Sequence, residues 1–144
     1  MILGKLVKMQ NLTAQESEGM GEEMLEGKYT DAQVGAILTA LKMKGETQEE
    51  IVGIARAMKR KAIIINPKAG KLVDSCGTGG DSSNTFNIST AAALVASGAG
   101  VSIAKHGNRS VSSNCGSADV LEELGVKMLE PERARECIEK IKFG

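Results

Sequence analysis

Residues suited to holding a phosphate are concentrated in one glycine-rich segment, residues 74–81. Gly77, Gly79 and Gly80 allow the backbone to adopt positive φ and to come close to a ligand. Between a strand and a helix, such a loop directs amide N–H groups at an anion. The segment therefore predicts a phosphate or pyrophosphate site, and a tight structural turn is the alternative. Further hydroxyl and amide groups follow it in the chain: Asn84, Thr85, Asn87, Ser89 and Thr90.

Two standard nucleotide-binding motifs do not fit this segment. A Walker A loop ends in Gly-Lys-Ser/Thr, and no lysine follows the glycines in that position. A dinucleotide-binding fingerprint requires a glycine where Ser82 stands, and an acidic residue where the chain has residues 104–106, Ala-Lys-His. Neither family is supported.

A second polar loop, residues 105–113, follows the next predicted strand. Lys105 and Arg109 supply positive charge suited to phosphate groups, and a solvated loop is the alternative. His106 stands apart from any Asp or Cys partner, so we expect a structural role and predict no catalytic residue. Three serines, Ser112, Ser113 and Ser117, supply further hydrogen-bond donors after His106. Ser117 is also predicted to be a helix N-cap.

The first 60 or so residues predict amphipathic helices joined by short turns. Three capping boxes mark helix starts, with Thr13, Thr30 and Thr47 each followed three residues later by Glu or Gln. Gly27 and Gly45 are placed to end two of these helices. Apolar residues recur at helical spacing behind the second and third boxes: Val34, Ile37, Leu38 and Leu41, then Ile51, Ile54, Ala55 and Met58.

From about residue 69 the pattern changes to short apolar runs that alternate with helices. Residues 72–76 and 101–104 predict two strands, and residues 126–129 a third. Helices are expected over residues 88–97, from Ser117 and from Pro131. This alternation predicts a parallel sheet with crossover helices. Both polar loops then lie at the carboxyl edge of the sheet, where α/β proteins bind ligands.

Composition excludes several classes of protein. The 144 residues carry 18 Lys+Arg and 18 Asp+Glu, and only 2% are aromatic. A base-stacking platform needs several aromatic side chains and a duplex binder needs a basic surface, so we expect no nucleic-acid partner. No apolar run is long enough to span a membrane. Three scattered cysteines predict a reducing, cytoplasmic setting, with Cys76 and Cys115 as small apolar fillers.

Four blocks of sequence resemble the anthranilate phosphoribosyltransferase family: residues 77–81, 84–90, 105–110 and 116–120. Their order and spacing match that family, and residues 41–47 are similar too. Pyrimidine nucleoside phosphorylases share the architecture, but Asn108 after Gly107 favours the anthranilate enzyme. The resemblance implies a helical dimerisation-type subdomain, residues 1–68, followed by an incomplete α/β domain of the nucleoside phosphorylase/phosphoribosyltransferase type, residues 69–144.

The resemblance also implies a reaction and a set of site residues. Anthranilate would displace pyrophosphate from 5-phosphoribosyl 1-pyrophosphate, with Mg²⁺ present, in tryptophan biosynthesis. Ser89 would bind Mg²⁺, and Gly77 and Asn108 would contact anthranilate. The phosphoribosyl pyrophosphate would be held by the following residues: Gly77, Gly80, Asp81, Thr85, Asn87, Ser89, Thr90, Lys105, Ser113 and Ser117.

Members of that family are more than twice as long as this chain. Their acidic magnesium-binding pair and an anthranilate-binding arginine belong to the later part, so we expect this chain to be inactive alone. The resemblance further implies a homodimer formed by the helical subdomains, with Leu3, Leu6 and Val7 in an exposed apolar patch. A folding or dimerisation module without catalysis, or a relative of the nucleoside phosphorylases, are the alternatives.

Overall fold

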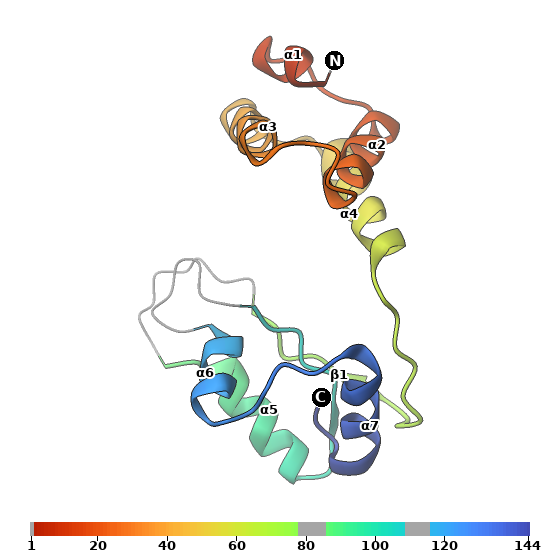
Figure 1. Ribbon diagram of the computed structural model, residues 1–144, viewed down its shortest axis with the longest axis vertical. Coiled ribbons are helices and arrows are strands. Elements are labelled where there is room, and N and C mark those ends of the chain that lie inside the picture. Colours follow the sequence, from red (N-terminus) through yellow and green to blue (C-terminus); the bar gives the residue numbers. More distant parts are fainter. Residues whose placement is uncertain (1, 78–85, 109–115) are drawn as a thin grey trace. The chain divides into compact units, whose positions relative to one another are not determined.

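The computed structural model describes residues 2–77, 86–108 and 116–144, which form two compact units, residues 1–63 and 64–144. The first unit contains four helices in its described residues: α1 (Ile2–Val7), α2 (Ala14–Leu25), α3 (Asp31–Lys44) and α4 (Gln48–Lys61) (Figure 1). The described part of the second has two strands and three helices: β1 (Leu72–Val73), α5 (Ile88–Gly98), β2 (Ser102–Ile103), α6 (Ser117–Glu123) and α7 (Pro131–Ile141).

All three predicted capping boxes are confirmed. Thr13, Thr30 and Thr47 are the N-caps of α2, α3 and α4, and each hydroxyl accepts a hydrogen bond from the amide three residues later. Gly45 follows α3 with a φ of 84°, which an L side chain rarely adopts. The helix boundaries of this unit therefore follow from short-range chemistry in the sequence.

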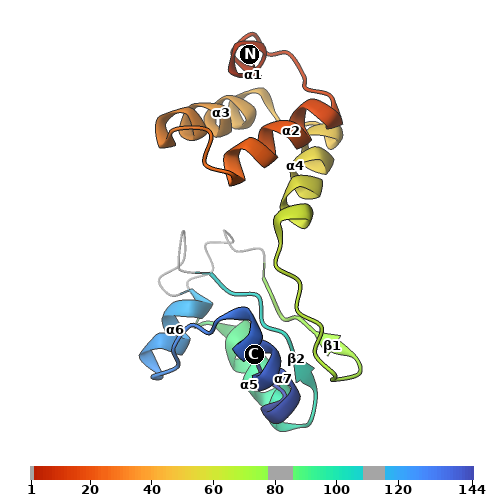
Figure 2. The same ribbon diagram turned by 45° about the vertical axis from the view of Figure 1, so that its right-hand side comes forward.

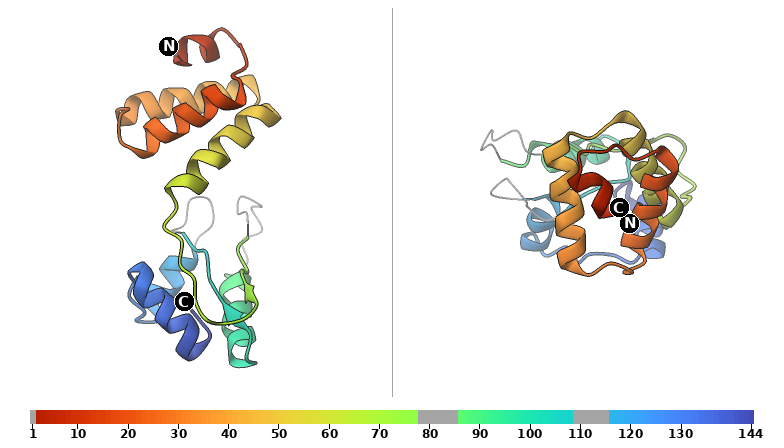
Figure 3. Two further views of the ribbon diagram at one scale, coloured as in Figure 1. Left: turned by 90° about the vertical axis from the view of Figure 1, so that its right-hand side faces the viewer. Right: turned by 90° about the horizontal axis from the view of Figure 1, so that it is seen from above.

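Helices α1 and α3 pack together, as do α2 and α4 (Figure 3). The hydrophobic core of the unit consists of Leu6, Leu12, Met20, Ile37 and Leu41. Half-buried apolar residues pack around this cluster. The expectation that Leu6 belongs to an exposed patch is wrong, because only 1% of its surface is accessible. Val7, the next residue, is exposed.

The buried face of α4 differs from the apolar face that its sequence suggests. Ile51 and Met58 are exposed, whereas Glu50, Gly53 and Ala57 are buried. Small residues lie on this face because α2 passes very close to it. A Cβ atom added to Gly53 would lie 2.4 Å from the backbone oxygen of Ala14 in α2, leaving no room for a side chain.

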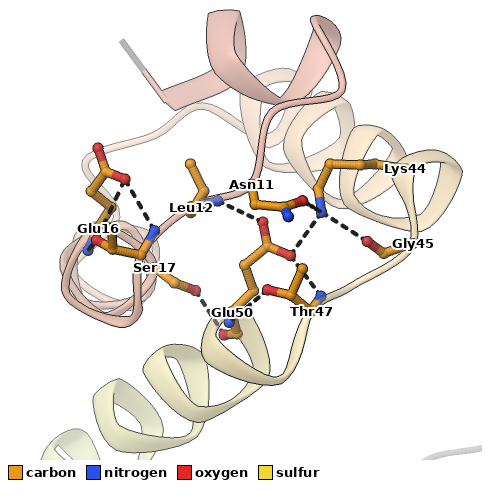
Figure 4. Close-up of polar contacts among 9 residues, drawn as sticks. Asn11, Leu12, Glu16, Ser17, Lys44, Gly45, Thr47 and Glu50 are labelled. Carbon is orange, nitrogen blue, oxygen red and sulfur yellow. Dashed lines mark hydrogen bonds and ion pairs between the residues drawn. The ribbon is translucent and has the colours of Figure 1, made fainter.

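The carboxylate of Glu50 is the centre of a buried polar network (Figure 4). It forms an ion pair with Lys44 at 2.8 Å, and the side chain of Lys44 is only 3% exposed. The amides of Leu12 and Thr47 donate to the same carboxylate at 2.9 and 2.8 Å. The hydroxyl of Ser17 donates to the backbone oxygen of Glu50 at 2.7 Å. The network thus ties the linker before α2, helix α2 and the end of α3 to the start of α4.

We expect the stability of the helical unit to fall as the pH drops from about 4.5 to about 2. Burial by itself would raise the pKa of Glu50, but the hydrogen bonds from Lys44, Thr47 and Leu12 outweigh it and lower the pKa to about 2. A lowered carboxyl pKa contributes stability above the unfolded-state value, and that contribution is lost on acidification. Urea unfolding at several pH values, on the wild type and Glu50→Gln, measures it. Identical pH dependence of the two proteins would contradict this role.

The second unit is built on a short parallel sheet, as predicted. β1 pairs with β2 in the register Leu72↔Ser102 and Val73↔Ile103 (Figure 2). Both strands are shorter than the predicted ranges 72–76 and 101–104. Helices α5 and α7 pack on β2, where Ile103 is buried. Leu72 and Val73, by contrast, are partly exposed on β1, which is paired on one side only within the described residues.

The prediction of a third strand over residues 126–129 is wrong. These residues form no strand, and Val126, Met128 and Leu129 are exposed. The edge of β2 away from β1 is instead taken by the residues after α7. There Ile103 and Phe143 form a parallel bridge, with Ile103 N–H donating to Lys142 O at 2.8 Å.

In the described ranges, no helix combines the length and apolar character of a membrane span.

Candidate functional site

Two loops leave the same edge of the sheet, because β1 and β2 are parallel. Residues 74–77 follow β1, and residues 104–108 follow β2. One carboxylate oxygen of Asp74 accepts the amide N–H of Cys76 at 3.0 Å and that of His106 at 3.1 Å. The predicted meeting of the two loops at the carboxyl edge is therefore observed in their described parts.

The N-terminus of α5 lies next to the first loop. Asn87 is the N-cap, and its side-chain oxygen accepts from the amide of Thr90 at 3.0 Å and from the hydroxyl of Ser89 at 2.9 Å. The hydroxyl of Ser75 donates to the backbone oxygen of Ser89 at 2.9 Å. Thr90 is 1% exposed, and its hydroxyl oxygen has no hydrogen-bond partner among the described residues. A buried hydroxyl is rarely left without a partner, so this oxygen is available to a ligand or water.

The second loop packs against the start of α6. A Cβ atom on Gly107 would lie 3.1 Å from the Cβ of Ser117, so a side chain here would press on that serine. The backbone amide of Ala118 donates to the backbone oxygen of Asn108 at 3.2 Å, and the side-chain amide of Asn87 donates to the Ser117 hydroxyl at 3.4 Å. These contacts bring Asn87, Asn108 and Ser117 together from three places in the sequence.

The prediction that Ser117 caps a helix is wrong by one residue. Gly116 is the N-cap of α6, and Ser117 is the first helical residue. Glycine has no side chain to cap the first-turn amides, but its own amide donates to the carboxylate of Asp119 at 2.9 Å. The hydroxyl of Ser117 is directed instead to Asn87.

Lys105 is the described cation of the second loop. Its side chain is half-buried, and the ammonium group donates to the backbone oxygen of His106 at 3.1 Å. Its own amide donates to the backbone oxygen of Gly144 at 2.7 Å. His106 is exposed, and its backbone rather than its ring makes the described contact with Asp74. This arrangement fits anion binding by Lys105 and a structural role for His106.

Four predicted site residues lie outside the described part of the chain: Gly80, Asp81, Thr85 and Ser113. Arg109 and Cys115 do so as well. Gly77 is described and exposed, and a Cβ atom on it would meet nothing within 4 Å. Cys76 is exposed, which contradicts its interpretation as a small filler.

Two residues with contacts in the site were given no role from the sequence. Asp74 connects the two loops, and Ser75 connects the first loop to α5. Their signal in the sequence is their position, since both polar side chains come directly after the apolar residues of β1. The partner of Asp74 depends on the neighbouring strand, and the partner of Ser75 depends on the placement of α5.

The described residues offer limited means of binding a metal. Within them, no group of three or more His, Cys, Asp or Glu side chains could hold a metal ion. The hydroxyl of Ser89 donates its proton to Asn87 and so keeps oxygen lone pairs available to a cation. A hydroxyl oxygen of this kind would suit Mg²⁺, which prefers oxygen ligands.

Sequence comparison places both parts of the chain in known domain families. Residues 1–62 match the helical bundle domain of a glycosyl transferase family, and residues 69–144 match the a/b domain of that family. The chain therefore belongs to this glycosyl transferase family. The two matched regions correspond to the helical unit and to the unit that carries the candidate site.

Among its relatives are several curated anthranilate phosphoribosyltransferases. That of Alkaliphilus metalliredigens is 51% identical over 143 residues, covering 99% of this chain and 42% of the relative. That of Myxococcus xanthus is 58% identical over 129 residues, covering 90% and 38%. The crystal structure of anthranilate phosphoribosyltransferase from Thermus thermophilus matches with a TM-score of 0.83 and 40% identity, covering 99% and 44%. The chain thus spans about two fifths of the length of these relatives.

Proposed function

We propose that this chain forms the phosphoribosyl pyrophosphate-binding part of an anthranilate phosphoribosyltransferase of tryptophan biosynthesis. The observation that carries the proposal is the meeting of two strand-end loops with the N-terminus of α5, where the buried hydroxyl of Thr90 has no partner among the described residues. Asn87 bonds to the amide of Thr90 and to the hydroxyl of Ser117, and Lys105 supplies a cation on the second loop. The relatives are named anthranilate phosphoribosyltransferases, which supports anthranilate and a phosphoribosyl donor as the substrates.

The proposed reaction is a displacement at the anomeric carbon of the ribose. The anthranilate amine forms the new C–N bond, the C–O bond to pyrophosphate breaks, and the amine loses a proton to solvent. Negative charge develops on the leaving pyrophosphate, where helix N-terminal amides and Lys105 stabilise it. No covalent intermediate with the protein is required. Gly77 and Asn108 are proposed to contact anthranilate, and Gly80, Asp81, Thr85 and Ser113 to complete the phosphate contacts.

We include Mg²⁺ in this proposal as the ion that accompanies pyrophosphate. When bound, Mg²⁺ would neutralise charge on the leaving group. Ser89 is the described residue that fits as its ligand, because its hydroxyl proton is donated to Asn87.

A cytoplasmic homodimer is the proposed form of the whole protein, without nucleic-acid or membrane partners. The helical unit leaves large apolar side chains exposed, which a second copy could cover. Among them are Val7, Leu38, Met43, Ile51 and Met58. We also propose that the rest of the α/β domain, as present in the longer relatives, is needed for turnover, because this chain spans 42% of a relative such as that of Alkaliphilus metalliredigens.

Replacing Lys105 by alanine is expected to weaken binding of 5-phosphoribosyl 1-pyrophosphate about tenfold or more, because a hydrogen bond to a charged group is lost. Thermal stability should change little, since the ammonium group contacts only a neighbouring backbone oxygen among the described residues. Calorimetric titration in the presence of Mg²⁺ measures the affinity. Lys127→Ala, at an exposed position outside the site, is the matched control.

Absence of binding by the wild type would contradict the proposed function. An equal loss of stability and affinity in Lys105→Ala would show that the lysine is structural. We expect this chain alone to form no phosphoribosyl anthranilate, and measurable formation would contradict the need for the rest of the α/β domain. In competition binding, displacement of a bound ligand by thymidine and not by anthranilate would favour a nucleoside phosphorylase.

A further inference from the structure

Asp74 occupies the point where the β1–β2 ladder ends. The last ladder bond runs from the amide of Ala104 to the backbone oxygen of Val73, at 3.0 Å. In a continued parallel ladder, the amide of His106 would donate to the backbone oxygen of Ser75. It donates instead to the carboxylate of Asp74, at 3.1 Å. A side chain therefore replaces the backbone acceptor at the first position beyond the sheet.

The same carboxylate oxygen also fixes the first loop. It accepts the amide of Cys76 at 3.0 Å, two residues further along its own strand. This local bond turns the backbone after β1 while the bond to His106 holds the neighbouring loop. One oxygen atom thus bonds to both loops where they leave the sheet.

These bonds bear directly on Lys105. Its backbone is held on one side by the bond from its amide to Gly144, and on the other by the bond from His106 to Asp74. The starting point of the lysine side chain is therefore fixed relative to Cys76 and Gly77. This fixed distance between the two loops favours an anion that contacts both of them, because groups already held in place bind without a further entropic cost of ordering.

We propose that Asp74 is the positioning residue of the candidate site, holding the two strand-end loops so that both can contact one anionic ligand. The identity of that ligand, a pyrophosphate group, rests on the proposed function. The role of Asp74 depends on its acceptor oxygen and not on its charge, since a negative charge beside an anion opposes binding. It thereby differs from a metal ligand, for which the charge would matter.

Two variants separate these roles. Asp74→Asn keeps a side-chain acceptor oxygen and removes the charge, whereas Asp74→Ala removes the acceptor. Amide hydrogen exchange, resolved by NMR without ligand, is expected to be about three- to tenfold faster at Cys76 and His106 in Asp74→Ala, and near the wild-type rate in Asp74→Asn. The affinity for inorganic pyrophosphate with Mg²⁺ should fall about tenfold in Asp74→Ala. In Asp74→Asn it should match or exceed that of the wild type.

Unchanged exchange at both amides in Asp74→Ala would overturn the proposal. Faster exchange with unchanged pyrophosphate affinity would also overturn it, because Asp74 would then have a structural role only. Equal loss of affinity in both variants would point to a charge-dependent role and against positioning. If the wild type fails to bind pyrophosphate, the proposed function is contradicted, and the exchange rates still decide whether Asp74 holds the two loops.

Discussion

Replacing Gly53 by alanine is expected to destabilise the helical unit by about 3 kcal/mol, as overpacking of a close contact does. The added Cβ would lie 2.4 Å from the backbone oxygen of Ala14 and 2.7 Å from the amide nitrogen of Glu18. Both atoms belong to the backbone of α2, so the contact can be relieved only by moving the helix. The higher helix propensity of alanine returns at most about 1 kcal/mol.

Gly35→Ala is the matched control for this prediction. Gly35 lies within α3, and a Cβ atom on it would meet no atom within 4 Å. Alanine there should stabilise the protein by up to about 1 kcal/mol through helix propensity alone. Urea unfolding followed by circular dichroism measures both variants. A Gly53→Ala protein as stable as the wild type would contradict the close packing of α2 on α4.

Replacing Glu50 by alanine is expected to cost about 3–5 kcal/mol, the range for breaking a buried ion pair. The change leaves the ammonium group of Lys44 without its carboxylate, in a side chain that is 3% exposed. It also removes the acceptor of the Leu12 and Thr47 amides. A loss of this size is a large part of the total stability of a typical domain.

Glu49→Ala is the control for the Glu50 prediction. Glu49 is the neighbouring acidic residue in the first turn of α4 and is exposed, so its loss should cost about 0.5 kcal/mol. A double variant, Lys44→Met with Glu50→Leu, should recover part of the loss, because it removes both charges. Recovery should remain incomplete, since the two backbone amides still lack an acceptor. A cost below about 1 kcal/mol for Glu50→Ala would contradict the central role of the network.

The helices of the first unit could be predicted because their signals are local. A threonine hydroxyl reaches the amide three residues later within its own turn, so Thr13, Thr30 and Thr47 mark helix starts wherever the helices pack. The burial of Glu50 could not be predicted in this way. Its partners Leu12 and Lys44 come from other elements, and the sequence shows it as an ordinary capping-box glutamate.

The position of the candidate site at the carboxyl edge of the sheet could be predicted from the sequence, but its individual contacts could not. Parallel strands place their carboxyl ends at one edge, and this rule correctly joined the loops that begin near residues 74 and 104. The pairing of Asp74 with His106 depends on register, and the contact of Gly107 with Ser117 depends on the approach of α6. The third strand was predicted in the wrong segment because residues 126–129 and 142–144 are both short and partly apolar, and hydrogen bonding to β2 selects the second.

The sequence by itself determined the helix starts, the parallel arrangement and the four sequence blocks that point to phosphoribosyl transfer. Each of these depends on residues close in the chain or on a general rule of topology. Only the tertiary structure decided that α4 buries Glu50, Gly53 and Ala57 in place of Ile51 and Met58. It also decided that one oxygen of Asp74 joins the two loops of the site. The physical reason is that packing distance and strand register bring together groups that the sequence keeps far apart.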